Sequence, residues 1–175
     1  MSDSAEYVVV SGGLRPSSRS RILAQHLIQI YQERGVSAAL LDLQALPLPI
    51  CDGNEAYSDK NVAVCSELLA PARVIIIATP IYNFDASAAV KNLVELTGEY
   101  WENKIVGFLC AAGGNSSYMS VMSLANSLML DFRCVIIPRF VYATGEDFHD
   151  KAAPTSEIKE RLAELAEFST KMRIG

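Results

Sequence analysis

Apolar and polar positions follow two alternating patterns along the chain. Short continuous apolar runs, typical of strands covered on both faces, alternate with stretches in which apolar residues recur every three or four positions, as in amphipathic helices. The predicted strands are residues 6–12, 37–43, 73–80, 104–112 and 134–143. The predicted helices are residues 20–34, 58–70, 86–97 and 117–132, and a last helix capped by Thr155. This alternation predicts an α/β three-layer sandwich, with one parallel sheet between two layers of helices.

The order of these elements predicts a single flavodoxin-like domain over residues 1–175. Right-handed crossovers between parallel strands leave few possible topologies. A chain of 175 residues suits a five-stranded parallel sheet in the order 2-1-3-4-5 better than a six-stranded dinucleotide-binding sheet. Because proline lacks an N–H group, we expect the third strand to end at Thr79-Pro80 and the fifth to break or end near Pro138.

Charge and apolar content argue against several classes of partner. The chain carries 15 Lys and Arg against 20 Asp and Glu, and its pI is near 5.0. An acidic protein is poorly suited to nucleic acid or to an anionic membrane surface. No apolar run is long enough to cross a bilayer, and residues 1–7 carry acid where a signal peptide needs Lys or Arg. We therefore expect a cytoplasmic protein with no nucleic-acid or membrane partner.

The cysteines show no pattern that would bind a metal ion. No two of them form a CxxC motif, and neither His26 nor His149 lies at ligand spacing from a cysteine. We therefore expect no metal site, and free, buried thiols in a reducing compartment. The four cysteines are Cys51, Cys65, Cys110 and Cys134.

The strongest chemical signal is the stretch SGGLRPSSRSRIL at residues 11–23, where the first strand leads into the first helix. A helix start offers free N–H groups and a positive dipole end to an anion. The stretch adds glycine backbone, a guanidinium and hydroxyls, and so predicts a phosphate site. Its predicted ligand residues are Gly13, Arg15, Ser18 and Ser20. Because the spacing is not GxGxxG, a single phosphate, as in FMN, fits better than the pyrophosphate of NAD. The alternative is a capped surface helix with solvated arginines.

Three further charged residues near this stretch are given ordinary roles. We expect Arg19 and Arg21 to lie on the surface rather than to bind a ligand. Asp42 ends the second strand, where dinucleotide-binding folds keep a ribose acceptor. Without the glycine fingerprint, we favour an ordinary loop acid at this position.

Two more loops are expected at the same edge, because ligands of open parallel sheets bind beyond the carboxyl ends of the strands. The loop at residues 79–85 can flank a flat ring and hydrogen-bond its edge; its predicted ligand residues are Pro80, Ile81, Tyr82 and Asn83. The loop at residues 111–117 offers backbone to a ring and a cap to the next helix. Its predicted ligand residues are Gly113, Gly114, Asn115 and Ser116. Each loop alone is also typical of a simple turn.

Four stretches occur in the order and spacing of one known family. Residues 12–15, 42–49, 79–83 and 113–114 are similar to its Gly-Ser-x-Arg stretch, its DLxxLPLP stretch, its TPxYN loop and its Gly-Gly loop. The chain therefore resembles the NAD(P)H-dependent FMN reductases of the flavodoxin-like superfamily, in particular those that supply reduced flavin to alkanesulfonate monooxygenases. The likeness extends to about Thr144.

The resemblance implies an oxidoreductase that binds FMN and takes hydride from NADPH or NADH. In this family, FMN accepts hydride at N5 from a nicotinamide on the exposed ring face. The reduced flavin then leaves, or passes electrons to a quinone, azo dye, metal ion or oxygen. The implied partner is a small-molecule electron acceptor or a flavin-dependent monooxygenase. Because the flavin carries the chemistry, no catalytic side chain is predicted.

One departure from the family and three alternative functions bear on this interpretation. The family's Ser in the phosphate loop is Gly13 here, so one hydroxyl contact with FMN is lost. A flavodoxin-type electron carrier with tightly bound FMN is one alternative, and a quinone, azo or chromate reductase of the same fold is another. A non-enzymatic interaction protein with a worn pocket is the third. The chain lacks the Thr-x-Thr-Gly-x-Thr loop of flavodoxins, and intact Arg15, Ser18 and Tyr82 argue against a worn pocket.

The helix at residues 86–97 predicts self-association. Small residues at its start permit close approach of another backbone, and Tyr100 and Trp101 follow its end; aromatic residues are enriched at interfaces. Relatives in the family pair through this helix and the next. We expect a homodimer or homotetramer, with Trp101 buried or half buried by association.

Overall fold

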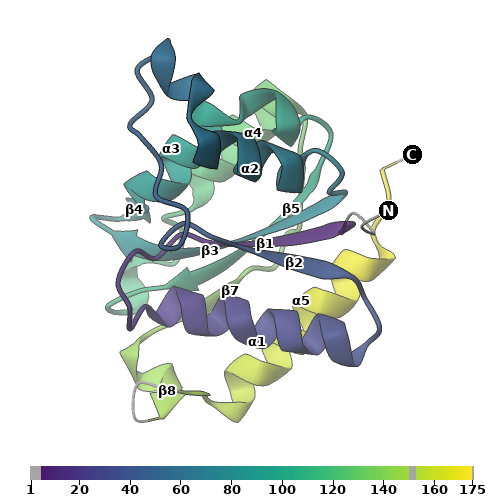
Figure 1. Ribbon diagram of the computed structural model, residues 1–175. Helices are drawn as coiled ribbons and strands as arrows, with labels where there is room; N and C mark the ends of the chain where they lie inside the picture. Colours follow the sequence, from purple (N-terminus) through teal and green to yellow (C-terminus); the bar gives the residue numbers. More distant parts are fainter. Residues whose placement is uncertain (1–4, 150–152, 175) are drawn as a thin grey trace.

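The computed structural model describes residues 5–149 and 153–174. One central sheet lies between two layers of helices, as predicted (Figure 1). The strands of this sheet are β1 (Tyr7–Ser11), β2 (Ala38–Asp42), β3 (Val74–Tyr82), β4 (Asp85–Ala86), β5 (Ile105–Ala111), β6 (Val135–Ile136) and β7 (Val141–Ala143). The helices are α1 (Arg19–Glu33), α2 (Lys60–Leu69), α3 (Ala88–Leu96), α4 (Met122–Phe132) and α5 (Ser156–Lys171). A separate pair of short strands is β8 (Phe148–His149) and β9 (Ala153–Pro154).

The central sheet has the predicted strand order but more strands than predicted. Its order is β2-β1-β3-β5-β6, which corresponds to 2-1-3-4-5 among the predicted strands, yet seven strands take part rather than five. The antiparallel strand β4 adds a hairpin to β3. The predicted fifth strand is divided into β6 and β7, on either side of Pro138. Both halves pair in parallel with β5, so the division leaves the topology unchanged.

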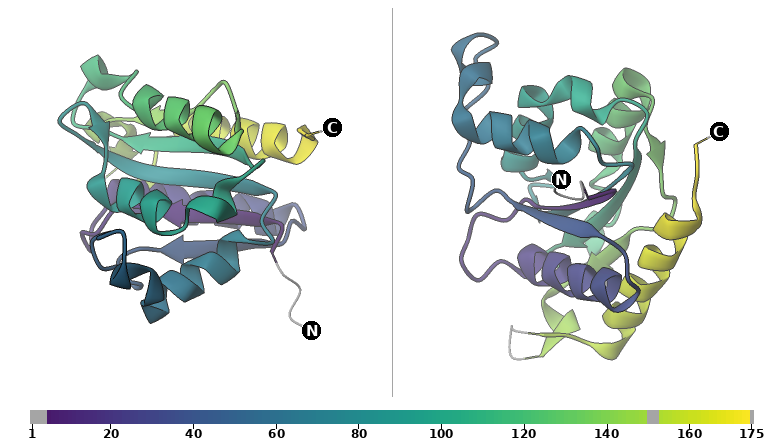
Figure 2. Two further views of the ribbon diagram at one scale, coloured as in Figure 1. Left: turned by 90° about the horizontal axis from the view of Figure 1, so that it is seen from above. Right: turned by 45° about the vertical axis from the view of Figure 1, so that its right-hand side comes forward.

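Helices cover both faces of the sheet (Figure 2), and each face has its own apolar core. Helices α1 and α5 pack on one face, and α2, α3 and α4 pack on the other. The hydroxyl groups of Tyr31 in α1 and Ser169 in α5 are 2.7 Å apart and tie the first layer together. Burial raises the pKa of Tyr31 to about 12. On α5, Ile158, Leu162 and Leu165 are buried against the sheet, whereas Phe168 is 49% exposed.

Strand β3 continues through Pro80, where the sequence pattern predicted its end. Its pairing with β1 stops at Ser11 and Ala78, whereas its pairing with β5 runs on to Pro80 and Ala111. The absent proline N–H therefore costs little, because one side of β3 has no partner strand there. After Tyr82 the chain turns back into β4 through Asn83 and Phe84, which both have positive φ, as in a two-residue hairpin turn.

Helix α4 begins five residues later than predicted. A 3-10 helix at Asn115–Ser117 precedes it, and the N-cap of α4 is Val121. The expectation that Asn115 and Ser116 cap this helix is therefore wrong. The hydroxyl of Tyr142 donates to the carbonyl of Gly114 and lies 2.8 Å from the Ser117 hydroxyl. These bonds hold the segment against β7 in a non-helical path.

Trp101 is buried within a single chain, which corrects the expected role in association. Its side chain is 0% exposed and lies in the core between the sheet and the α2–α4 layer. Its indole Nε1–H donates to Thr97 Oγ1 at 2.9 Å. The Thr97 hydroxyl in turn donates to the carbonyl of Leu93 at 2.6 Å. An aromatic residue at a helix end thus packs inward here because a buried partner satisfies its N–H.

Replacing Thr97 by valine should destabilise the protein. The change leaves the buried indole N–H without an acceptor, and an unsatisfied buried donor costs about 1–3 kcal/mol. The free energy of unfolding, measured by urea denaturation, should fall by about that amount. Thr170→Val is the matched control, because the Thr170 hydroxyl also donates to a carbonyl one turn earlier, that of Glu167, but near solvent. Equal stability of the two variants would contradict the assignment.

Candidate functional site

Three loops meet at the carboxyl ends of β1, β3 and β5 and enclose a cavity of about 330 Å³. These loops and the end of β3 carry all the predicted ligand residues, with Pro80, Ile81 and Tyr82 lying in β3 itself. The residues that line the cavity are Arg15, Ser17, Ser18, Arg19, Ser20, Pro80, Ile81, Tyr82, Ala111, Ala112 and Gly113. The structure therefore brings together the three loops that the sequence placed at one edge of the sheet.

The first two loops are joined by hydrogen bonds beneath the cavity. The N–H of Gly12 donates to the carbonyl of Ala78 at 2.8 Å. The hydroxyl of Ser87 donates to the carbonyl of Gly12 at 3.2 Å, and the Ser87 N–H donates to Thr79 Oγ1 at 3.0 Å. A Cβ at Gly12 would overlap Val90 of α3. Glycine is thus required here for close packing of the first loop on α3, and the packing fixes the loops relative to one another.

The start of α1 faces the cavity without a side-chain cap. Ser18 is the N-cap residue, but its hydroxyl bonds the Ser20 hydroxyl at 2.9 Å and not a backbone N–H of the helix. The first N–H groups of a helix have no acceptor within it, and the first turn of α1 contains no acidic residue. These donors and the positive end of the helix dipole remain available to an anion.

Gly13 leaves room for the paired hydroxyl groups. A Cβ at this position would overlap Ser18 Oγ and would lie 2.6 Å from Ser20 Oγ. The hydroxyls of Ser18 and Ser20 therefore occupy the space that the family's serine side chain would enter. Glycine in place of serine at position 13 removes one hydroxyl group but leaves space for those of Ser18 and Ser20. A glycine cradle, two hydroxyls and an uncapped helix start fit a phosphate group.

The three arginines of the first loop lie in three different environments. Arg15 is exposed and lines the cavity. Arg19 also lines it, and its guanidinium carbon lies 5.7 Å from the centre of the Phe148 ring. Arg21 is 7% exposed and forms an ion pair with Asp42, with Nε and Oδ2 separated by 3.0 Å. The expectation of a surface position is therefore wrong for Arg21, which is buried against Asp42. Arg19 is partly exposed, and its expected lack of a ligand role stays a prediction.

The second loop presents one ring and a rigid backbone to the cavity. Pro80, Ile81 and Tyr82 line it, and Tyr82 is 54% exposed, so its ring is free to flank a ligand. Asn83 lies at the tip of the hairpin, at φ 50°. It is not among the lining residues, and its contact with a ligand stays a prediction.

The third loop and the end of β5 contribute two alanines and a glycine. Ala111, Ala112 and Gly113 line the cavity, and a Cβ at Gly113 would meet no atom within 4 Å. The predicted ligand residues Gly114, Asn115 and Ser116 follow directly in the chain but are not among the lining residues; their contacts stay predictions. Sequence reasoning missed Ser17, Ala111 and Ala112, which carry no distinctive chemistry, and Arg19, which the serine-rich pattern could have indicated.

Cysteines and histidines lie outside this cavity. Burial raises the pKa of Cys65 to about 11, of Cys110 to about 12 and of Cys134 to about 11, so these thiols stay protonated near neutral pH. His26 lies on α1, where burial lowers its pKa, and His149 lies in β8. No group of His, Cys, Asp or Glu in the described part of the chain is arranged to hold a metal ion. The residues that line the cavity include no His, Cys, Asp or Glu among those that the structure describes.

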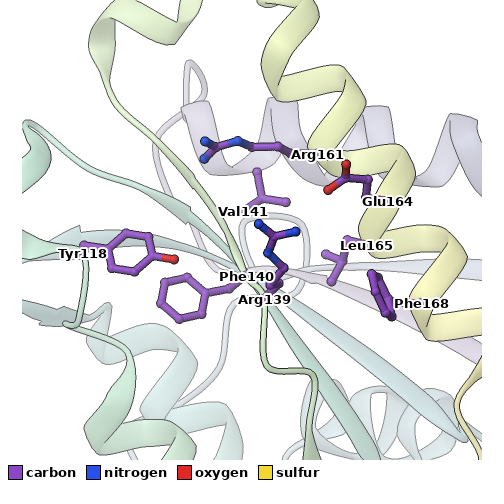
Figure 3. A pocket seen from close by; sticks show the side chains of 8 residues that line it. All are labelled: Tyr118, Arg139, Phe140, Val141, Arg161, Glu164, Leu165 and Phe168. Atoms are coloured by element: carbon purple, nitrogen blue, oxygen red, sulfur yellow. The ribbon is translucent and has the colours of Figure 1, made fainter.

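A second cavity, of about 130 Å³, opens beside β7 and α5 (Figure 3). It is lined by Tyr118, Arg139, Phe140, Val141, Arg161, Glu164, Leu165 and Phe168. Arg161 pairs with Glu157 at 3.1 Å, and the ring of Tyr118 stacks on Phe140 with 4.8 Å between centroids. Its charges are of both signs and no helix starts at its wall, so it lacks the features that favour an anion in the first cavity.

Comparison with known proteins agrees with this geometry. Residues 6–149 match the NADPH-dependent FMN reductase family. The chain belongs to this family. It is 30% identical over 134 residues to the NAD(P)H-dependent FAD/FMN reductase of Geobacillus thermodenitrificans (strain NG80-2). The aligned region covers 75% of this chain and 72% of that protein. It is 26% identical over 172 residues to the FMN reductase (NADPH) of Pseudomonas aeruginosa, which covers 95% and 91%.

A solved structure shows the same fold. The apo form of NADH:FMN oxidoreductase EmoB superposes with a TM-score of 0.79 at 14% identity, over 97% of this chain and 90% of that chain. The family membership confirms the predicted resemblance and the oxidoreductase class, with FMN and NAD(P)H as flavin and reductant. In residues 5–149 and 153–174, each helix is too short or too polar to cross a bilayer.

Adding a methyl group at Gly13 should weaken FMN binding. In Gly13→Ala the new Cβ must displace the Ser18 hydroxyl, which alters the surface expected to meet the phosphate. We expect the dissociation constant for FMN, measured by titration calorimetry, to rise about tenfold, or about 1.4 kcal/mol. Gly98→Ala is the control, since its Cβ would only touch the Phe132 ring at 3.5 Å. Unchanged FMN affinity in Gly13→Ala would show that this cradle does not meet the flavin.

Proposed function

We propose that this reductase binds FMN in the cavity at the carboxyl edge of the sheet and reduces it with NADPH or NADH. The observation that carries the proposal is the uncapped start of α1, with the Ser18 and Ser20 hydroxyls beside it. The phosphate of FMN would lie there, near Arg15. The flavin ring would lie between Pro80–Tyr82 and Gly113, which line the other side of the same cavity.

The residues of the site would bind and orient the flavin. The flavin supplies the redox chemistry by accepting hydride from the nicotinamide. The end of β3 and the glycine backbone after β5 line the cavity with few flexible side chains. The exposed ring of Tyr82 can flank the flavin, and the open cavity leaves room for the nicotinamide. Asn83, Gly114, Asn115 and Ser116 remain candidate contacts to the ring edge.

The product and partner belong to the same proposal. Reduced FMN would leave to serve a flavin-dependent monooxygenase, or would pass electrons to a small acceptor such as a quinone or an azo compound. A cytoplasmic location suits the free cysteines, three of which are buried. A flavodoxin-type carrier is the second candidate, and the NAD(P)H assay below separates the two.

Activity and the Arg15→Ala variant test the proposal together. The wild-type protein should consume NAD(P)H when FMN is added, whereas a carrier would be isolated yellow and would react slowly. In Arg15→Ala, the free energy of FMN binding should weaken by about 1.5–3 kcal/mol, the range for a hydrogen bond to a charged group. Riboflavin, which lacks the phosphate, should bind wild type and variant equally.

The matched control is Arg133→Ala, which removes another exposed arginine, one that pairs with Glu102 far from the cavity. Its FMN affinity should be that of the wild type. If Arg15→Ala loses riboflavin as strongly as FMN, Arg15 has a structural role and the phosphate assignment is wrong. If FMN stimulates no NAD(P)H oxidation by wild type, the reductase assignment is wrong.

We also propose a homodimer, or a tetramer built from dimers. Buried Trp101 no longer supports it, but an exposed apolar surface on α4 and just before it does. Four apolar side chains on α4 and just before it are 39–77% exposed: Met119, Met122, Met129 and Leu130. Light scattering at micromolar concentration should give at least about twice the 19.1 kDa of one chain. A mass of one chain, unchanged by FMN, would contradict this proposal.

A further inference from the structure

Arg21 is a buried arginine whose bonds go to the phosphate loop itself. Its Nη2 donates to the carbonyl of Gly13 at 3.1 Å, and its Nη1 donates to the carbonyls of Arg15 at 3.1 Å and Pro16 at 3.3 Å. Nη2 also donates to Asp42 Oδ1 at 3.0 Å, and Nε lies 3.0 Å from Asp42 Oδ2. One guanidinium thus joins three loop carbonyls to the end of β2.

We propose that Arg21, anchored by Asp42, is a positioning residue that shapes the first loop for the flavin phosphate without touching it. The proposal rests on the proposed function, which places the FMN phosphate at this loop. It differs from the role of Arg15, whose exposed side chain lines the cavity.

The bonds of Arg21 exclude a direct contact with the phosphate. A guanidinium has five N–H donors in a fixed plane and accepts no hydrogen bond. The two Nη groups of Arg21 make four hydrogen bonds, to the three carbonyls and to Asp42 Oδ1. Its Nε makes no hydrogen bond within the described part of the chain but is buried 3.0 Å from Asp42 Oδ2 in the ion pair. No donor is accessible to a ligand, because both Nη groups are bonded within the protein, Nε is buried, and the residue is only 7% exposed. Any effect of Arg21 on FMN must therefore act through the loop.

The geometry of the peptide bond gives that effect a direction. In a planar trans peptide, the carbonyl of one residue and the N–H of the next point in opposite directions. The carbonyls of Gly13 and Pro16 point at Arg21, so the N–H groups of Leu14 and Ser17 point away from it. The third carbonyl precedes a proline, which has no N–H. The guanidinium thereby holds the loop carbonyls on its own side. The backbone N–H groups of Leu14 and Ser17 face the opposite side.

Asp42 fixes this arrangement to the sheet. It lies opposite Ser11 in the β1–β2 register, and the N–H of Leu43 donates to the carbonyl of Ser11 at 3.1 Å. Its carboxylate also accepts from the N–H of Gln44 at 3.1 Å. The carboxylate neutralises the buried guanidinium, which would be costly to bury alone. The loop shape is therefore set by a residue of β2 that does not line the cavity.

Arg21→Lys tests the proposal, with FMN and riboflavin affinities as the readout. Lysine keeps the positive charge but cannot reach three carbonyls and a carboxylate with one ammonium group. We expect the dissociation constant for FMN to rise at least about tenfold, which corresponds to about 1.4 kcal/mol. Riboflavin affinity should change less than about twofold, because its ring contacts lie in the other loops. Asp42→Asn should lower the preference for FMN by a smaller factor.

Arg73→Lys is the matched control for general destabilisation. Arg73 is also a partly buried arginine; it bonds Glu6, the Tyr7 hydroxyl and the carbonyl of Met172 at the other end of the sheet. Its variant should keep the wild-type ratio of FMN to riboflavin affinity even where its melting temperature falls. If Arg21→Lys does not fold, the ratio in Asp42→Asn decides.

The outcomes separate this inference from the proposed function. The positioning role is overturned if folded Arg21→Lys keeps the wild-type ratio of FMN to riboflavin affinity, or loses affinity for both ligands equally. The FMN site stands in either case. A wild-type protein that binds FMN and riboflavin equally well overturns the phosphate assignment, and the role of Arg21 with it. A selective loss of FMN in Arg21→Lys, absent from Arg73→Lys, supports the positioning role.

Discussion

The open start of α1 is the constraint on which the rest of the site depends. The first N–H groups of a helix need partners outside it, and here the N-cap serine turns its hydroxyl to Ser20 and leaves them open. Free donors and the positive end of the helix dipole act together on an anion. The other features of the first loop keep this position accessible: Gly13 adds no side chain, and the loop carbonyls are bonded elsewhere.

The sheet brings the other two loops to the same place. Strands β1, β3 and β5 are parallel neighbours, so their carboxyl ends reach one edge. The register pairs Ser11 with Ala78 and Pro80 with Ala111, which sets how far each loop extends. Because Gly12 and Ser87 bond the first two loops together, the cavity is formed on rigid elements. Such a site suits a cofactor that does its own chemistry and needs to be held in a fixed orientation.

The sequence pattern was sufficient for the layers of the fold but not for the details of the loops. The run at residues 73–80 indicated a buried central strand, because continuous aliphatic residues need cover on both faces. It could not show that β3 passes Pro80, since that depends on β1 having ended there. The start of α4 was misplaced for a similar reason: Tyr142, on β7, bonds Gly114 and Ser117 and holds that segment outside the helix.

The sequence by itself determined the three-layer fold, the strand order and the loop that offers an anion site, since periodicity, glycine and hydroxyl residues act over a few neighbouring positions. The family motifs added FMN and NAD(P)H. Only the tertiary structure decided the roles of Trp101, Arg19 and Arg21. Each is polar or amphipathic, so local sequence allows it to lie inside or outside. Its place depends on a partner: Thr97 for the indole, Phe148 for Arg19, and Asp42, with the loop carbonyls, for Arg21. Burial of a polar side chain is favourable only where its hydrogen-bond partners are already in position, and for the two arginines folding brings those partners together.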